Sequence, residues 1–253
     1  MSMKWLGVYA RRALALAVVL AIWESLAANG YVDPFYMPPP SAIGAIVVDQ
    51  FASGDIWPHL QATFGAALLG LALGILFGIF LGFVAALIPY LAELLEPVMA
   101  MLNAIPRVIL APLFIIWLGI GIGSKVALSF ILVVVLTFFA VYNGIRDVDQ
   151  RLVERVRTLG GGRLVLVREV YIPSVVAWVM GNLKVAVGFA FTGAVVGEFV
   201  AASRGLGYLL SYAQSTYNAS LTMALIFLVM VFVLFLFTLA GMLERYLLRW
   251  KGS

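Results

Sequence analysis

The chain has 253 residues, of which 64% are hydrophobic and 11% are charged, and it contains no cysteine. A soluble domain carries roughly twice that share of charged residues, so a water-soluble globule of this composition would lack polar surface. The composition also excludes a disordered chain, a disulfide-stapled fold and a thiolate metal site. We therefore predict an all-α integral membrane protein that forms a single domain over residues 1–253.

The hydrophobic residues gather into windows that are long enough to cross a bilayer. A transmembrane helix needs about 20 mostly apolar residues. The clear windows are 60–88, 98–118, 124–142, 174–198 and 221–243. A further window, 11–28, is weaker because it contains Glu24, and the basic residues before it leave a signal peptide as an alternative. Trp23 and Glu24 are poor neighbours for a cleavage site, which favours a span and a total of about six.

The net charge of +4 matters less than the places where the basic residues lie. Cytoplasmic loops of membrane proteins are enriched in Lys and Arg. The outer loop 29–59 contains neither, whereas the loop 143–173 carries six arginines: Arg146, Arg151, Arg155, Arg157, Arg163 and Arg168. The distribution predicts about six spans with both termini in the cytoplasm. It places Lys125 and Arg204 on external segments.

The outer loop has an extended part and a helical part. Pro38, Pro39 and Pro40 interrupt helical structure. Ser41 is a plausible N-cap, because its hydroxyl can accept a backbone N–H of the first helical turn. We therefore expect a short amphipathic helix over 42–51, at the outer membrane surface.

The window 60–88 carries small residues at every fourth position. Small residues at this spacing allow two helix backbones to approach closely within lipid. The contact is either within the chain or between subunits, and the sequence leaves both open. The ridge comprises Ala62, Ala66, Gly70, Gly74, Gly78, Gly82 and Ala86.

Two windows contain residues that weaken helices. Pro97, Pro106 and Pro112 punctuate the third span, and each removes a backbone donor. Glycines weaken the fifth span as well, because glycine favours a helix less than other residues do. Freed backbone groups are tolerated at membrane depth where protein or a watery cavity satisfies them. The third and fifth spans are thus candidates for lining a pathway, with ordinary kinks as the alternative.

The sequence contains no motif for a reaction that the chain could catalyse by itself. The string from Gly119 to Lys125 departs from a phosphate-binding loop, because Ser124 stands where a glycine is required before the lysine. His59 is the only histidine and follows Trp57-Pro58, where a surface or helix-start role is expected. We predict no catalytic residue, no metal site, no cofactor bound by this chain and no nucleic-acid partner. Directed work would need a gradient or a partner protein.

The cytoplasmic loop contains the most specific motif. Glu154-Arg155-Val156-Arg157-Thr158-Leu159-Gly160 is followed by Val170-Tyr171-Ile172-Pro173. This resembles the signature of ABC importer permeases, in which Glu-Ala-Ala, three residues and Gly precede Ile-x-Leu-Pro. The glutamate, glycine, proline and spacing match, whereas Arg155-Val156 departs from Ala-Ala.

The resemblance extends from about residue 20 to the C-terminus and points to the sulfonate/taurine/nitrate branch of that family. Lys184 departs from the branch, which usually has Arg there, and Phe191 stands where Trp is usual. The segments that carry the resemblance are Trp23-Glu24, Met37 to Ala42, Ala111-Pro112-Leu113, Trp117 to Gly121, Gly181 to Gly188 and Glu198 to Gly207.

The resemblance implies a type I ABC importer permease fold with a cytoplasmic coupling helix in the loop 143–173. Two helical turns over Arg151–Leu159 would dock on a separate ATPase, and the glycines after them permit a sharp turn. A second helical stretch from Arg163 to Tyr171 would be stopped by Pro173. A solvated basic loop is the alternative. The implied coupling residues are Glu154, Arg155, Val156, Arg157, Leu159, Gly160, Gly161, Gly162 and Pro173.

The resemblance also implies an assembly. A second copy of the chain would form a homodimer in the inner membrane of a bacterium or archaeon, surrounded by lipid. Two ABC ATPase subunits would bind inside and carry the ATP and Mg. A periplasmic or lipid-anchored solute-binding protein would dock outside.

Ionisable residues inside a helix bundle are usually functional. Lys184 lies midway along the fifth span and is either a ligand for an anionic or carbonyl-bearing solute or a structural partner of Glu24 or a carbonyl. Glu198 is a candidate for an external gate, and Arg107 either lines the pathway or anchors the third span. The candidates for an apolar gate, with core packing as the alternative, are Phe114, Trp117, Phe189 and Phe191.

Two other functions compete with an importer permease. A self-sufficient secondary transporter or channel would need intramembrane carboxylates, and beyond Glu24 and Glu198 the predicted spans offer almost none. A membrane enzyme would need a catalytic constellation that a chain with one histidine and no cysteine does not supply. The resemblance implies a small anionic or polar organic solute of the sulfonate, taurine, nitrate or pyrimidine-precursor class.

Overall fold

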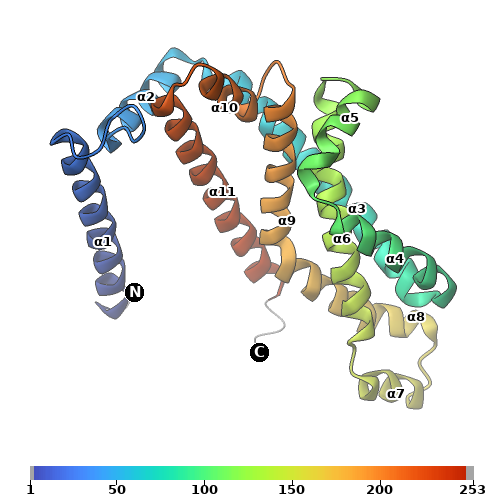
Figure 1. The fold of residues 1–253 in the computed structure, drawn as a ribbon. Helices are drawn as coiled ribbons and strands as arrows, with labels where there is room; N and C mark the ends of the chain where they lie inside the picture. The colour runs from blue at the N-terminus through green and yellow to red at the C-terminus, as the bar shows by residue number, and fades with distance from the viewer. Residues whose placement is uncertain (1–2, 249–253) are drawn as a thin grey trace. The chain divides into compact units, whose positions relative to one another are not determined.

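The computed structural model describes residues 3–248, apart from the side chains of residues 3–6, 8, 9 and 107. Within these limits the chain is helical and has no strand (Figure 1). The side chains of four basic residues lie outside the described part of the chain, namely those of Lys4, Arg107, Arg249 and Lys251. The elements are α1 (Met3–Ala28), α2 (Pro40–Ser53), α3 (Ile56–Leu87), α4 (Pro89–Ala104), η1 (Arg107–Ile109), α5 (Leu110–Leu118), α6 (Ile122–Arg146), α7 (Gln150–Thr158), α8 (Arg163–Leu166), η2 (Val167–Tyr171), α9 (Ile172–Val200), α10 (Leu206–Ser215) and α11 (Ala219–Leu247).

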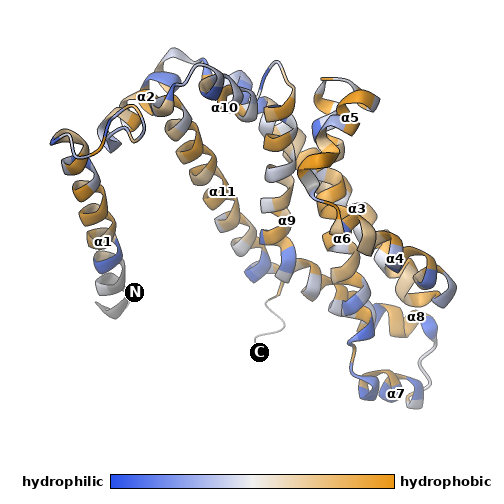
Figure 2. Cartoon of the chain, in the orientation of Figure 1, coloured by the Kyte–Doolittle hydropathy of each residue, from blue (hydrophilic) through white to orange (hydrophobic). Residues whose placement is uncertain are grey.

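Four helical segments of the described residues are long and apolar enough to cross a membrane: α3, α6, Arg163–Val200 and α11. Figure 2 shows them as mostly hydrophobic ribbons, whereas α7 is largely hydrophilic. The windows 60–88, 124–142, 174–198 and 221–243 fall in or almost wholly in these segments. The window 11–28 lies in α1, and the count of about six spans stays a prediction.

The window 98–118 does not form one helix, and its interruption agrees with the expectation that prolines punctuate the third span. α4 ends at Ala104, and the chain passes through η1 before α5 begins at Leu110. Ile105 adopts an extended conformation with φ −69° and ψ 128°. The ring of Pro106 disfavours the helical conformation at the preceding residue, which explains the break. Pro97 lies inside α4, and Pro112 lies in the first turn of α5, where a missing N–H costs little.

The chain divides into two compact units: residues 1–57 with 209–230, and residues 58–208 with 231–253. In the first unit, α2 begins at Pro40 with Pro39 as its N-cap, so the expectation of a Ser41 cap is wrong. The Ser41 N–H and hydroxyl donate instead to the Glu24 carboxylate at 3.0 and 2.6 Å. Glu24 thus satisfies a free donor of the first turn of α2 and ties that helix to α1.

The second unit is built around α6, the most buried of the four long helical segments. One face of α6 lies against α9 and contributes Val133 to a core with Phe191 and Ala194. Another face packs beside α4 through Phe138 and Tyr142. The helix is therefore covered by neighbours on several sides, and its buried residues form the centre of the unit.

The small-residue ridge of α3 lies against α6 of the same chain. A Cβ atom added at Gly74 would lie 2.5 Å from Val133 Cβ, and one added at Gly78 would lie 2.5 Å from Thr137 Cβ. Gly82 approaches the Phe138 carbonyl in the same way. Of the two roles left open by the sequence, the intramolecular contact is the one present in this structure.

Candidate functional site

The loop between α6 and α9 contains a short helix with defined ends. The Asp149 carboxylate accepts the Arg151 N–H at 2.9 Å and caps the start of α7. At the other end, Gly160 N–H donates to Arg157 O and Gly161 N–H to Val156 O, both at 2.9 Å. This pair of bonds is a Schellman motif, and it requires the left-handed conformation of Gly160, whose φ is +81°. The structure thus has a helix where the sequence predicts two turns.

One face of α7 is anchored and the other is free. Val153 is buried in a small cluster with Leu166 and Val170, which fixes α7 to the helical stretch before α9. On the outer face Leu159 is 79% exposed, and Leu164 beyond the turn is 82% exposed. Apolar side chains gathered on an otherwise polar surface mark a binding region. The predicted coupling residues Glu154, Arg155 and Arg157 are exposed as well.

Pro173 does not stop the second helical stretch, so that expectation is wrong. The chain stays helical from Arg163 through η2, a π-helix, into α9. Ile172 N–H donates to Val167 O, five residues back, as a π-turn requires. The wider turn accommodates Pro173 at the start of α9, where a proline is tolerated. The loop is thereby joined to α9 by continuous helical backbone.

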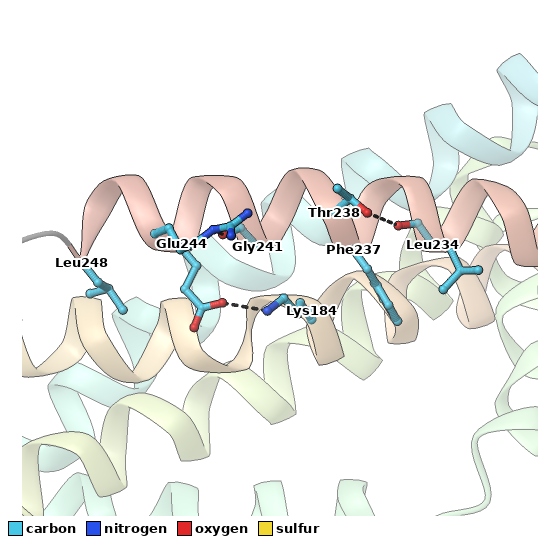
Figure 3. A pocket seen from close by; sticks show the side chains of 8 residues that line it. Lys184, Leu234, Phe237, Thr238, Gly241, Glu244 and Leu248 are labelled. Atoms are coloured by element: carbon cyan, nitrogen blue, oxygen red, sulfur yellow. Dashed lines mark hydrogen bonds and ion pairs between the residues drawn. The ribbon is translucent and has the colours of Figure 1, made fainter. Parts of the chain in front are cut away.

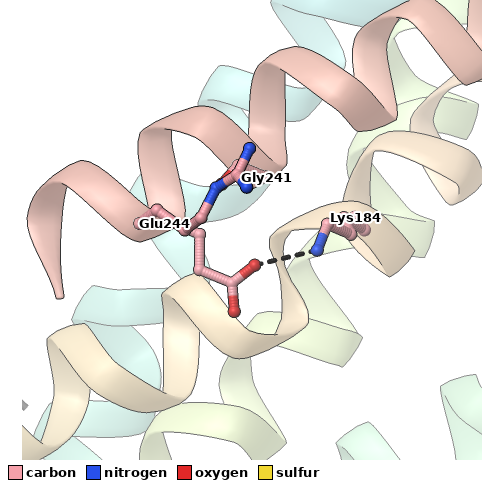
Figure 4. Close-up of polar contacts among 4 residues, drawn as sticks. Lys184, Gly241 and Glu244 are labelled. Carbon is pink, nitrogen blue, oxygen red and sulfur yellow. Dashed lines mark hydrogen bonds and ion pairs between the residues drawn. The ribbon is translucent and has the colours of Figure 1, made fainter. Parts of the chain in front are cut away.

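Lys184 on α9 forms an ion pair with Glu244 on α11, with Nζ and Oε2 3.0 Å apart (Figure 4). The structural partner suggested from the sequence, Glu24, is wrong, because that carboxylate binds Ser41. The pair lines a groove of about 670 Å³ along α11, which Figure 3 shows with Phe237 and Leu234 on its wall. Sequence reasoning missed Glu244 because the predicted span ends at residue 243.

Glu198 organises a buried polar cluster at the end of α9. It is 2% exposed and accepts the Thr63 hydroxyl at 2.8 Å and the Gly207 N–H at 3.0 Å. Thr63 in turn accepts the Leu206 N–H at 2.8 Å. Gly205, with φ +121°, leaves no room for a side chain beside the carboxylate. The cluster fixes the α9–α10 loop to α3.

Lys125 and His59 belong to the same region, which sequence reasoning did not assign to them, although His59 does lie in the first turn of α3, as its expected helix-start role requires. Lys125, which was expected on an external segment, lies in the first turn of α6 and is 3% exposed. Its ammonium donates to the carbonyls of Ile120 and Ala201 at 2.5 and 2.6 Å. His59 accepts the Gly205 N–H at 3.1 Å and stacks on Tyr208. A lysine within an apolar window was the signal for the first residue.

The predicted aromatic gate does not come together as one group. Phe114 and Trp117 form an edge-to-face pair on α5, and Trp117 is 65% exposed. Phe191 is 3% exposed and packs edge-to-face on Phe64 in the core, with Phe189 beside the same core. Arg107 lies in η1, and its side chain is outside the described part of the chain.

The described residues contain no group of three or more His, Asp or Glu side chains that could hold a metal ion. The arrangement that they do contain is a bundle of apolar helices, an anchored loop helix with one free face, and charged groups between α9 and α11. This arrangement defines the chain as a helical membrane protein whose loop helix presents an exposed face.

Comparison with known proteins identifies the family. Residues 74–249 match the binding-protein-dependent transport system inner membrane component, and the chain belongs to this family. It is 34% identical to the riboflavin transport system permease protein RibX of Chloroflexus aurantiacus, over 95% of this chain and 90% of the relative. It is 26% identical to the taurine transport system permease protein TauC of Escherichia coli, over 94% of this chain and 88% of the relative.

The fold is that of ABC importer permeases. A crystal structure of an amino acid ABC transporter with histidines matches with a TM-score of 0.65 and 18% identity, over 79% of this chain and 97% of that chain. The chain is therefore a permease subunit of an ABC importer with the type I permease fold, and it is an inner-membrane transport component rather than an enzyme. The family works with an ATPase and a solute-binding protein.

Proposed function

We propose that this chain forms the translocation pathway of its importer for a small organic solute that carries an anionic or polar group. The observation that carries the mechanism is the free face of α7, which presents Leu159 and the coupling charges from an anchored helix. Similar permeases are named for riboflavin and for taurine, an aminoalkyl sulfonate, and these names support the solute class.

The coupling residues would act through the rigidity of the loop. An ATPase subunit that binds the outer face of α7 would move Val153 together with Leu166 and Val170, because these three side chains form one buried cluster. The helical backbone from Arg163 to Val200 would carry that displacement along α9. Lys184 and Glu198 both lie on this segment, so the pathway candidates would shift with the loop. ATP and Mg would be bound by the partner ATPases.

An apolar surface on the first unit supports the proposal that two copies of the chain form a homodimer. Its groove of about 630 Å³ is lined by apolar side chains of α1, α2 and α11, including Leu20, Val47 and Phe227. The indole N–H of Trp23 on this groove is buried and has no hydrogen-bond partner among the described residues. A second copy of the chain would cover this apolar surface within the lipid. The distribution of the basic residues supports a topology with both termini in the cytoplasm.

The experiment that tests the proposal replaces Leu159 by aspartate and measures which proteins purify with the tagged permease from its native membrane. The wild type is expected to retain a P-loop ATPase, and Leu159→Asp to lose it while the permease stays folded. Tyr31→Asp is the matched control, because Tyr31 is 80% exposed in the predicted outer loop. Solute uptake by the purified permease alone, without ATP, would instead establish a secondary transporter.

A further inference from the structure

The last turns of α6 hold two neighbouring helices at the point where the chain enters the loop that carries α7. On one side, the Ser174 hydroxyl of α9 donates to the Gly144 carbonyl at 2.6 Å. A Cβ atom added at Gly144 would lie 2.7 Å from Trp178 Cδ1, so α6 and α9 are in close contact here. On the other side, α4 lies beside the same end of α6 (Figure 1). The helix ends at Arg146, and Asp149 caps α7 soon afterwards.

Extended residues separate α4 from the helices before and after it. Ile88 has φ −122° and ψ 100°, and Ile105 is extended as well. A displacement therefore does not reach α4 through continuous helical backbone, in contrast to the passage from α8 into α9. Side chains hold α4 instead, and its Ala92 and Met99 share a buried cluster with Phe138 of α6. Apolar contacts are non-directional, so they do not by themselves fix the position of α4 along α6.

A tyrosine supplies a directional link between the two helices. Tyr142 of α6 is 4% exposed, and its hydroxyl donates to Glu96 Oε2 of α4 at 2.9 Å. The same hydroxyl accepts Arg146 Nη1 at 2.8 Å. A phenol has one proton to donate, so that proton is committed to Glu96. The described side chains of Glu96 and Arg146 form no direct ion pair, and the hydroxyl is therefore the group that joins them.

The ring that carries this hydroxyl is fixed in place. Phe138 is fully buried and stacks on the Tyr142 ring, with centroids 5.7 Å apart and an angle of 11° between the planes. The Arg146 guanidinium lies 5.2 Å from the centroid of the Tyr142 ring, within the range of a cation–π contact. Hydrogen bonds to charged partners are stronger than neutral ones, and bonds in a chain polarise one another. The position of α4 is thus tied to the residue that ends α6.

We propose that Tyr142 is a positioning residue that makes α4 move together with the loop that carries α7. The inference rests on the proposed function, because it adds a second output to the displacement that an ATPase imposes on α7. In that function α9 follows the loop through helical backbone. α4 follows it through the hydrogen-bonded chain of Glu96, Tyr142 and Arg146. Both helices beside the end of α6 then change position in step when the ATPase binds ATP.

Double electron–electron resonance between two nitroxide labels tests the proposal, because the chain has no cysteine of its own. The labels are attached to Gln150→Cys on α7 and Met101→Cys on α4, at two exposed positions. The complex with its ATPase is measured in nanodiscs, first without nucleotide and then trapped with ATP and vanadate. A tagged, labelled copy is co-expressed with unlabelled chain, so that each distance lies within one chain. With Tyr142 intact we expect one distance in both states. In Tyr142→Phe the distance should shift on trapping by about 1–2 Å or more, the size of helix displacements in such transitions.

The controls separate the hydroxyl from a general loss of structure. The reference pair joins Gln150 to Val185 on α9 and should keep one distance in the wild type and in Tyr142→Phe. Tyr90→Phe removes the hydroxyl of a tyrosine on α4 that is 77% exposed, and it should behave as the wild type. Glu96→Gln keeps a carbonyl oxygen that can accept the Tyr142 hydroxyl and should preserve the constant distance, whereas Glu96→Leu should not.

The proposal is overturned if the distance between α4 and α7 changes on trapping in the wild type, or if it stays constant in Tyr142→Phe. A shift of the reference pair in Tyr142→Phe would also contradict it, because the variant would then have loosened the loop as a whole. Copurification of the ATPase is expected for the wild type and for all of these variants. A complex that copurifies but fails the distance test overturns this inference alone, whereas a wild-type permease that retains no ATPase refutes the proposed function.

Discussion

Replacing Gly74 by alanine tests the close contact between α3 and α6. The added Cβ would lie 2.5 Å from Val133 Cβ and 2.7 Å from its Cγ1. Carbon atoms in contact are about 3.5–4.0 Å apart, so the two helices must separate by roughly 1 Å. Val133 is fully buried, which prevents its side chain from moving aside. Overpacking of this kind costs about 1–3 kcal/mol of unfolding free energy.

Gly65 on the same helix is the matched control. An added Cβ there would meet only Ile122 Cδ1 at 3.7 Å, an ordinary contact. Alanine at that position should be neutral or stabilising by up to about 1 kcal/mol, because it favours helix over glycine. The assay is unfolding in SDS from mixed micelles, followed by tryptophan fluorescence. If Gly74→Ala is as stable as Gly65→Ala, α3 and α6 do not pack as described.

Three further predictions concern the other parts of the site. Thr63→Ala should lower the free energy of unfolding by about 1–3 kcal/mol and speed hydrogen exchange at the Leu206 amide, because the Thr63 hydroxyl donates to Glu198 and accepts from Leu206. Thr63→Ser keeps the hydroxyl and should leave both measurements unchanged. Gly160→Ala should cost about 1–2 kcal/mol through backbone strain alone, since φ is +81° and nothing lies near the added Cβ. Gly162→Ala, in an extended conformation, should be neutral in the same unfolding measurement, and equal effects at the two positions would contradict the Schellman turn. Phe191→Ala should cost about 3–5 kcal/mol in SDS unfolding because the ring is buried, whereas Trp117→Ala should cost far less; the reverse order would remove Phe191 from the core.

The apolar windows predicted most of the long helices, because helix length in a bilayer is set by a bulk property that the sequence displays directly. The coupling motif likewise indicated α7, since capping and glycine turns act over a few neighbouring residues. The break at Pro106 and the continuation through Pro173 show the limit of this reasoning. A proline follows the end of α4, whereas a second proline follows a π-turn and leaves the helix continuous. Only the surrounding structure distinguishes these two cases.

Side-chain partners were less predictable than elements. Lys184 has a carboxylate partner, but the sequence suggested Glu24 where the structure has Glu244, because pairing depends on which helices lie side by side. Lys125 and Thr63 gained their roles from the fold of the α9–α10 loop, which brings groups far apart in the sequence into one buried cluster. The glycine ridge was visible as a pattern, but its partner helix was not.

The most direct test of the central claim is a crosslink between α7 and the ATPase. The chain has no cysteine, so Leu159→Cys introduces a single reactive thiol on the free face of α7. With a bifunctional maleimide and an ATPase carrying a surface cysteine, the account predicts a crosslinked permease–ATPase product in native membranes. Tyr31→Cys should give none. A crosslink from residue 31 but not from residue 159 would contradict the assignment of α7 as the coupling helix.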